Sequence, residues 1–132
     1  MMMKMEKRIG IWTKASGSIE AMITAENPKT AEAIWAALPI KGNANRWGDE
    51  IYFSISVKIG EENARDEVGV GSVAYWPPGK ALCIFFGPTP VGRHGEPRAA
   101  SPVNVFGKIV GDAAVFRKVR ANDEISLEKH QI

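Results

Sequence analysis

Glycines and prolines divide this chain into short segments, and their spacing limits the folds that it can adopt. The 132 residues include 13 glycines and 8 prolines. Both residues favour turns, because glycine tolerates positive φ angles and proline fixes φ. Several segments between the turns alternate apolar and polar residues at period two, which is typical of half-buried strands. With 45% hydrophobic and 24% charged residues, close to the globular average, the sequence predicts an all-β barrel or sandwich.

Length, charge and cysteine content narrow the class of protein. A chain of 132 residues has the size of one domain, so we expect a single domain over residues 1–132, with residues 1–7 as a disordered tail. The net charge of +2 argues against binding to nucleic acid or a membrane surface. We see no signal-peptide core or membrane-spanning apolar run, and the single cysteine, Cys83, cannot form an internal disulfide. These features predict a cytoplasmic protein in a reducing compartment.

The first third of the chain predicts a hairpin and a helix. Residues 8–15 and 18–25 have apolar residues at period two on either side of Ser16-Gly17, which favours a β-hairpin. Asn27 is the expected N-cap, and Pro28 suits the first helical position. Apolar residues then recur at the spacing i, i+3, i+4, i+7 until Pro39, so we expect an amphipathic helix that caps one end of the sheet.

Alternation and turn residues predict the remaining elements. The expected strands are residues 44–57, broken at Gly48-Asp49, and residues 68–76, 81–86, 103–110 and 124–129. Asp112 is expected to cap a short helix before the last strand. Residues 60–66 and 87–102 are expected to be loops, and the second is rich in glycine and proline. A long ordered loop in a compact domain is often functional.

Motifs for nucleotide, metal or hydrolytic chemistry are missing. The sequence has no GxxxxGK[ST] phosphate loop, and Gly69-Val70-Gly71 is not followed by the helix that a dinucleotide site needs. His94, His130 and one cysteine match no zinc-ligand spacing. Ser101 and His94 share a loop, but no GxSxG elbow is present. We therefore predict no cofactor and no metal.

Two segments resemble the cyclophilins, a family of prolyl isomerases. Phe106-Gly107-Lys108-Ile109, followed by Gly111-Asp112, is similar to the closing strand and short helix of that family, and Pro28-Lys29-Thr30-Ala31-Glu32 is similar to the start of its first helix. The pattern over nearly the whole chain looks most like the small prokaryotic cyclophilin-like fold family, a minimal barrel with no settled activity. The resemblance implies a mainly β fold, a cyclophilin-like closed β-barrel of about eight strands with one or two short helices.

The same resemblance implies a changed active site. Arg46 lies in the region where cyclophilins place their catalytic arginine and is the one catalytic candidate. The family's histidine and tryptophan fall at Val103 and Arg98, and the strand at residues 82–86 lacks the family's glutamine. Because several groups that position the substrate are missing together, ordinary prolyl isomerisation is not expected.

The leading hypothesis is a domain that binds a small molecule or a short peptide in the groove corresponding to the cyclophilin cleft. Arginines beside aromatic rings can hold a carboxylate or phosphate while the rings stack on the ligand. The candidate binding residues are Arg46, Tyr52, Trp76, Phe86, Arg93, His94 and Arg98. The simpler interpretation is that the three aromatics belong to the barrel core and the arginines to a solvated rim. Two alternatives stay open, a weak or divergent prolyl isomerase and a homodimeric or scaffold protein that uses residues 87–102 for contacts.

Overall fold

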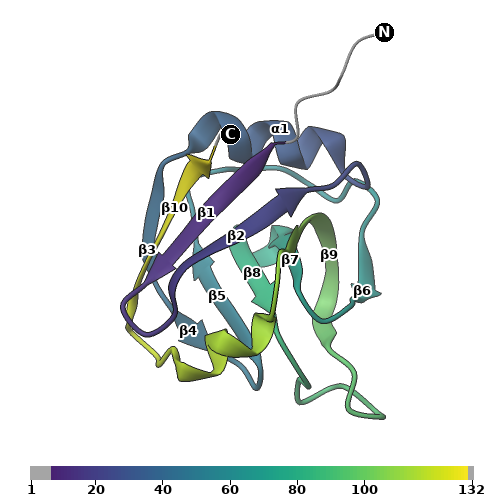
Figure 1. Cartoon of the computed structure of the whole chain (residues 1–132). Helices are drawn as coiled ribbons and strands as arrows, with labels where there is room; N and C mark the ends of the chain where they lie inside the picture. The colour runs from purple at the N-terminus through teal and green to yellow at the C-terminus, as the bar shows by residue number, and fades with distance from the viewer. Residues whose placement is uncertain (1–6, 131–132) are drawn as a thin grey trace, which may run out of the picture.

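The computed structural model describes residues 7–130 as one curled β-sheet with a helix at one end (Figure 1). The predicted tail at residues 1–7 lies outside this range except for Lys7, whose carbonyl oxygen accepts a hydrogen bond from the Ile23 N–H at 3.0 Å. In chain order the elements are β1 (Arg8–Thr13), β2 (Gly17–Ile23), α1 (Pro28–Ala37), β3 (Ile40–Asn43), β4 (Asn45–Arg46), β5 (Glu50–Ser54), β6 (Arg65–Glu67), β7 (Ser72–Trp76), the 3-10 helix η1 (Pro77–Gly79), β8 (Ala81–Phe85), β9 (Arg98–Ile109), the 3-10 helix η2 (Ala113–Lys118) and β10 (Glu124–His130).

The predicted hairpin and helix are confirmed, but the cap of the helix differs from the prediction. Strands β1 and β2 pair antiparallel with Thr13 opposite Gly17, which has a φ of 70°. Helix α1 begins at Pro28, yet the Asn27 side chain makes no capping hydrogen bond. Its amide instead donates to the Val105 carbonyl at 2.7 Å and accepts from the Asn63 N–H at 2.7 Å. Asn27 therefore joins the helix start to β9 and to the loop before β6.

The predicted closed barrel of eight strands is wrong. The structure has ten strands among the described residues, in the order β3-β10-β1-β2-β9-β7-β8-β5-β4 with β6 beside β9, so hydrogen bonds do not close the sheet. The end strands β3 and β4 are consecutive in sequence and meet at Ala44. The Ala44 N–H donates to the Asp123 carbonyl and its carbonyl accepts from Asn122. Because these groups bind the turn before β10, β3 and β4 pair with different strands, and no strand pairing among the described residues joins the two ends of the sheet.

Strand pairing shortens both predicted loops. Strand β6 lies partly within the predicted loop at residues 60–66 and pairs with β9, which begins at Arg98 rather than at Val103. The Arg98 guanidinium forms ion pairs with Asp66 at 3.1 Å and Glu67 at 2.6 Å. These pairs join segments more than thirty residues apart, so local sequence patterns do not reveal them.

The sheet carries hydrophobic residues on both faces. One face of β5, β7 and β8 presents residues such as Ile51, Tyr75 and Leu82 to the main core inside the curled sheet. Alternate residues of the same strands, with residues of β9, form a smaller cluster on the other face. Its buried members are Val68, Ala74, Ala81, Cys83, Phe85, Ala99, Val103 and Val105. No helix among the described residues is long and apolar enough to cross a membrane.

Candidate functional site

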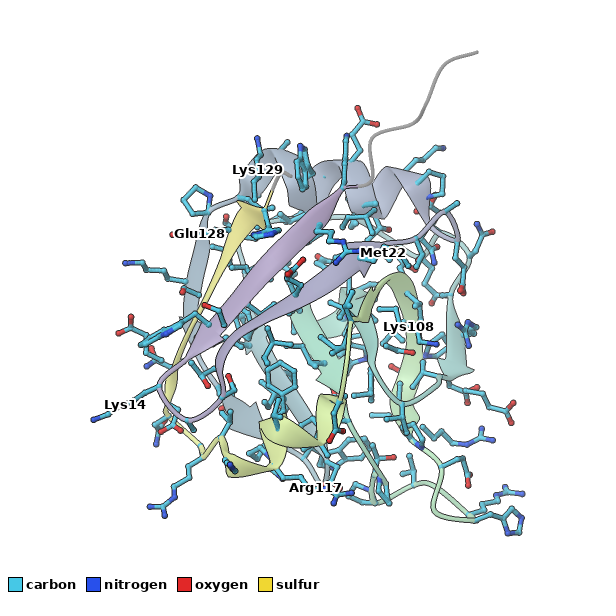
Figure 2. The ribbon with its side chains drawn as sticks, viewed as in Figure 1. Lys14, Met22, Lys108, Arg117, Glu128 and Lys129 are labelled. Carbon is cyan, nitrogen blue, oxygen red and sulfur yellow. The ribbon has the colours of Figure 1, made fainter. Side chains whose placement is uncertain are left out.

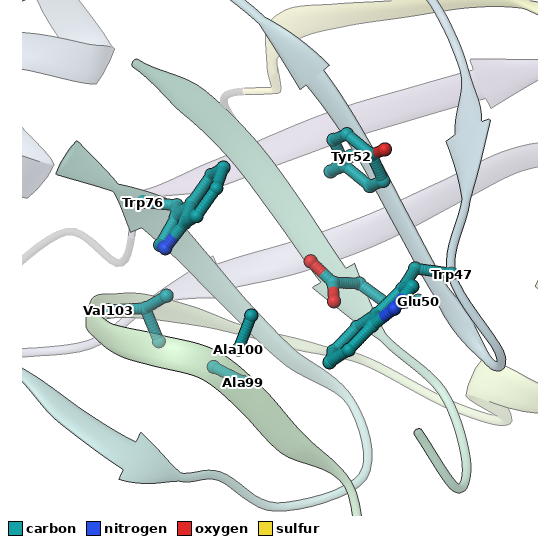
Figure 3. A pocket seen from close by; sticks show the side chains of 7 residues that line it. All are labelled: Trp47, Glu50, Tyr52, Trp76, Ala99, Ala100 and Val103. Carbon is teal, nitrogen blue, oxygen red and sulfur yellow. The ribbon is translucent and has the colours of Figure 1, made fainter. Parts of the chain in front are cut away.

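A hollow beside the smaller cluster is walled mainly by aromatic and apolar side chains (Figure 3). Its volume is about 160 Å³. We call it the aromatic pocket, and it is lined by Trp47, Glu50, Tyr52, Trp76, Ala99, Ala100 and Val103. The lining comes from the turn between β4 and β5, from β5 and β7, and from β9. The pocket thus lies where three strands and a turn, distant in sequence, come together.

Strand alternation places Glu50 and Tyr52 on the same wall of the aromatic pocket. They are two residues apart on β5, so their side chains point to the same face of the sheet, while Ile51 and Phe53 point into the main core. Figure 3 shows the Glu50 carboxylate directed into the space between the aromatic rings. Only 6% of the residue is exposed, which is unusual for a glutamate.

Trp76 is held in place from across the sheet. Its indole Nε1–H donates to the Ser101 hydroxyl oxygen at 2.7 Å, which ties the end of β7 to β9. Gly79 lies directly under the indole, because a Cβ at that position would come within 2.5 Å of the ring. The hydrogen bond therefore fixes the N–H edge of the Trp76 ring, and Gly79 packs against the ring.

A tight turn positions Trp47. The backbone groups of Trp47 and Glu50 exchange two hydrogen bonds, at 3.0 and 3.1 Å. The turn needs glycine at Gly48, where φ is 59° and a Cβ would lie 3.0 Å from the Pro88 carbonyl oxygen. The Asp49 N–H donates to that same carbonyl at 2.9 Å, so the turn is fixed against the loop that follows β8.

Arg46 stabilises this turn through the hydrogen bonds of its guanidinium group. Its guanidinium donates to the Gly48 carbonyl at 2.9 and 3.1 Å and to the Val119 carbonyl at 2.7 Å, and it pairs with Asp49 at 3.3 Å. Arg117 of η2, at the bottom of the view in Figure 2, lies 3.5 Å from the same aspartate. The arginines thus hold the loop ends together, and neither of them lines the aromatic pocket.

Burial shifts the ionisation of two neighbouring groups in this region. Desolvation raises the pKa of Glu50 to about 7, and a hydrogen bond with the Cys83 side chain lowers it in part. Desolvation, together with the Glu50 charge, raises the pKa of the Cys83 thiol well above its ordinary value. At neutral pH Glu50 therefore exchanges readily between its two protonation states, while Cys83 stays a thiol.

Two of the predicted binding residues, Tyr52 and Trp76, line the aromatic pocket together. Arg46 lies under the turn, with its guanidinium carbon 5.0 Å from the centroid of the Phe86 ring. Phe86 itself is 1% exposed and packs in the main core against Phe116.

The other three predicted residues border a separate shallow hollow with Glu67, Val68 and Glu96. Arg93 and His94 are exposed, and their backbone N–H groups donate to the Glu96 carboxylate at 2.8 and 2.7 Å. Arg98 is engaged with β6 by its ion pairs. The structure therefore does not bring the seven predicted residues into one groove.

Sequence reasoning missed Trp47, Glu50 and the three small residues of β9 that complete the pocket. A charged residue at the start of a strand is usually exposed, so Glu50 was not a candidate. The period of two on β5 was the available signal, because it places Glu50 on the same face as Tyr52. Within residues 7–130 no group of three or more His, Cys, Asp or Glu side chains is placed to hold a metal ion.

Comparison with known proteins agrees with this fold. The chain matches the Cyclophilin-like family over residues 7–128. It is also similar to the solution structure of a hypothetical protein from Archaeoglobus fulgidus, with 42% sequence identity and a TM-score of 0.79, over 98% of this chain and 100% of that chain. No curated protein matches it. The chain therefore belongs to the cyclophilin-like family.

Proposed function

We propose that this protein is a binding domain that holds one small group of a ligand in the aromatic pocket. The ligand is either a small molecule or a short peptide that inserts one side chain. The observation that carries this proposal is a concave site of aromatic walls with a single inward carboxylate, the usual composition of a small-molecule site.

The size of the aromatic pocket limits what it can hold. Drug-sized ligands occupy pockets of about 300–1,000 Å³, whereas this one has about 160 Å³. An engineered cavity of about 150 Å³ in another protein binds benzene. The pocket therefore suits one ring or one branched alkyl group, and the rest of a larger ligand would lie outside it.

The walls are fixed before a ligand arrives. Trp76 is held by Ser101, and the turn that carries Trp47 is held by Arg46 and by the Pro88 carbonyl. Fixed walls lower the entropy cost of binding, because fewer side chains must be ordered.

A fragment screen by NMR tests this proposal. The probes are capped amino acids, small amines and single-ring compounds, and the reporters are the indole N–H signals of Trp47 and Trp76. We expect some probes to shift these signals and to raise the melting temperature. Ala100 is exposed at the rim of the pocket, so Ala100→Phe should block binding, whereas Ala36→Phe on the exposed side of α1 should not. Probes that never shift the indole signals, or that do so equally in Ala100→Phe, would refute the proposal.

Weak prolyl isomerisation is the second candidate function. It is favoured by family membership and by the position of Val103, which lines the pocket where the resemblance places the family's histidine. Against it, the arginine that would act on the prolyl nitrogen has its donors directed at Gly48, Asp49 and Val119. A protease-coupled assay on a proline peptide, with Arg46→Ala as the comparison, tests it. A rate equal to the uncatalysed one at high protein concentration would remove this candidate.

A homodimer or scaffold role is the third candidate. It is supported by the exposed position of Arg93 and His94 on the loop between β8 and β9. Light scattering tests it, because a monomer at all concentrations would count against self-association.

A further inference from the structure

We propose that the aromatic pocket selects a small organic cation, an alkylated ammonium group, with the Glu50 carboxylate as its counter-charge and Trp47, Tyr52 and Trp76 as its walls. This inference rests on the proposed binding function and names the class of ligand.

The first observation is the absence of a positive partner for Glu50. Among the described residues Glu50 forms no ion pair, and no lysine, arginine or histidine lines the pocket. A buried carboxylate without a partner is costly, and native proteins normally pair such a charge or keep it neutral. A ligand that brings a positive charge would complete the pair.

Two other carboxylates of this chain make the hydrogen bonds that are typical of a structural role. Glu62 accepts hydrogen bonds from the Lys29 and Thr30 N–H groups and the Thr30 hydroxyl, and Glu96 accepts from two backbone N–H groups. Among residues 7–130 the Glu50 carboxylate has only the weak thiol donor of Cys83, and that thiol also lies 3.9 Å from the Ala81 carbonyl oxygen. Its side chain therefore adds little to the fold where it is and has capacity left for a ligand.

The second observation is the kind of wall around that carboxylate. Indole and phenol rings attract cations to their faces, and rings gathered round one point recognise alkylated ammonium groups. Here three such rings share one pocket with Glu50, and the facing wall consists of small apolar residues of β9. Methyl groups of the ligand can pack on that wall while the positive nitrogen faces the carboxylate. A neutral ligand would gain only the apolar contacts.

The ionisation of Glu50 makes this selection dependent on pH. The titratable groups that face Glu50 are the Cys83 thiol on β8 and the Tyr52 phenol on β5, whereas β7 and β9 contribute Trp76, two alanines and a valine. Burial raises the pKa of Glu50 to about 7, so below that pH only a minority of the molecules have an ionised Glu50. A permanent cation binds this ionised form. Its affinity should rise about tenfold from about pH 6 to about pH 8, in proportion to the ionised fraction.

The test compares choline with 3,3-dimethyl-1-butanol, a neutral molecule of the same shape, by NMR titration of the full chain at pH 8. We expect choline to bind at least about tenfold more tightly, the ratio that one charge-assisted contact of about 1.4 kcal/mol produces. Glu50→Gln should remove this preference, while Glu32→Gln, on the exposed side of α1, should retain it. Trp76→Leu, which keeps an apolar wall but removes a ring, should weaken choline more than the alcohol.

The outcomes separate the two proposals. Equal affinities for the two molecules, or a preference for choline that survives Glu50→Gln, would overturn the cation inference and leave the binding function standing. If choline does not bind while other fragments shift the indole signals, the cation inference is overturned as well. The proposed function fails too if no probe shifts the indole signals, or if the shifts are the same in Ala100→Phe. The melting temperature of each variant shows whether it is folded.

Discussion

The carboxylate of Glu62 accepts hydrogen bonds from the backbone N–H and the hydroxyl of Thr30, at 3.0 and 2.9 Å, across 32 residues of sequence. The first turn of α1 has no acidic residue of its own, so Glu62 supplies the negative charge that a helix N-terminus favours. The Asn104 side chain belongs to the same hydrogen-bond cluster, because it donates to the Thr30 hydroxyl and accepts from the Glu62 N–H, both at 3.0 Å. The loop before β6, the helix and β9 are therefore linked through one polar cluster.

Replacing Glu62 should loosen this link. We expect Glu62→Gln to lower the melting temperature by a few degrees at neutral pH, since the charge at the helix start is lost while the shape is kept. Thermal unfolding followed by circular dichroism measures the change. Glu61→Gln is the matched control, because Glu61 is exposed beside it. Equal shifts in the two variants would show that Glu62 has no special role.

The effect of Glu62 should also fade in acid. Partial desolvation raises the pKa of Glu62, but the hydrogen bonds from Thr30 and Lys29 outweigh it, so the pKa lies below its usual value. A carboxyl whose pKa is lower in the folded state stabilises the fold above its unfolded pKa, and this is lost as the pH falls through the folded pKa. The difference between wild type and Glu62→Gln should therefore shrink from about pH 6 to about pH 3. A difference that is independent of pH would contradict this origin.

Arg46 should act through structure. Its guanidinium donates to the Val119 and Gly48 carbonyls at 2.7 and 2.9 Å, and hydrogen bonds that involve a charged group contribute about 1.5–3 kcal/mol each. Because the arginine is partly exposed, we expect Arg46→Ala to lower the free energy of unfolding by only about 1–3 kcal/mol. Denaturant unfolding measures this loss, and Arg93→Ala, in an exposed loop, is the control. Unchanged stability in Arg46→Ala would leave a direct role in ligand binding as the better account of this residue.

Ser101 should control the orientation of Trp76. The Trp76 indole N–H donates to the Ser101 hydroxyl at 2.7 Å, so Ser101→Ala should free the ring and speed the exchange of that proton with water. Binding in the aromatic pocket should weaken by a few fold, because the ring must then be ordered on binding. NMR exchange rates and the fragment titration measure the two effects, with Ser18→Ala on the exposed face of β2 as the control. An indole signal that stays unchanged would show that packing alone holds the ring.

Sequence patterns predicted the elements whose causes are local. The hairpin follows from alternation around Gly17, the start of α1 from Pro28, and the cap of η2 from Asp112, whose side chain accepts from the Ala114 N–H. The family resemblance, confirmed over residues 7–128, predicted the β-rich fold but not the open order of its strands.

Features that depend on contacts between distant segments could not be predicted from the sequence. Strand β6 depends on its pairing with β9 and on the ion pairs of Arg98, and α1 is capped by Glu62, not by Asn27. The burial of Glu50 likewise arises only when β9 folds over the face of β5 and β7. Tyr52 and Trp76 could be proposed from their type, but their partner carboxylate required the folded arrangement.

Glu50 should lower the stability of the unliganded protein at neutral and alkaline pH. Desolvation raises its pKa from the usual 4.5 to about 7, against a smaller opposing effect of Cys83. The folded protein then holds a proton that the unfolded chain releases, so the stability of the wild type falls as the pH rises from about 4.5 to about 7 and levels off above that.

Glu50→Gln removes this titration and should be the more stable protein at pH 8, by up to about 3 kcal/mol, because each unit of pKa corresponds to about 1.4 kcal/mol. The advantage should vanish below about pH 4.5, where Glu50 is protonated in the folded state and mostly protonated in the unfolded chain as well. Urea unfolding at several pH values measures it, with Glu32→Gln as the control. If the wild type is the more stable protein at pH 8, the carboxylate is held by the fold itself and is not kept at a cost for a ligand. If Glu50→Gln is the more stable, the protein retains a destabilising charge at the centre of the aromatic pocket, as a site for cations requires.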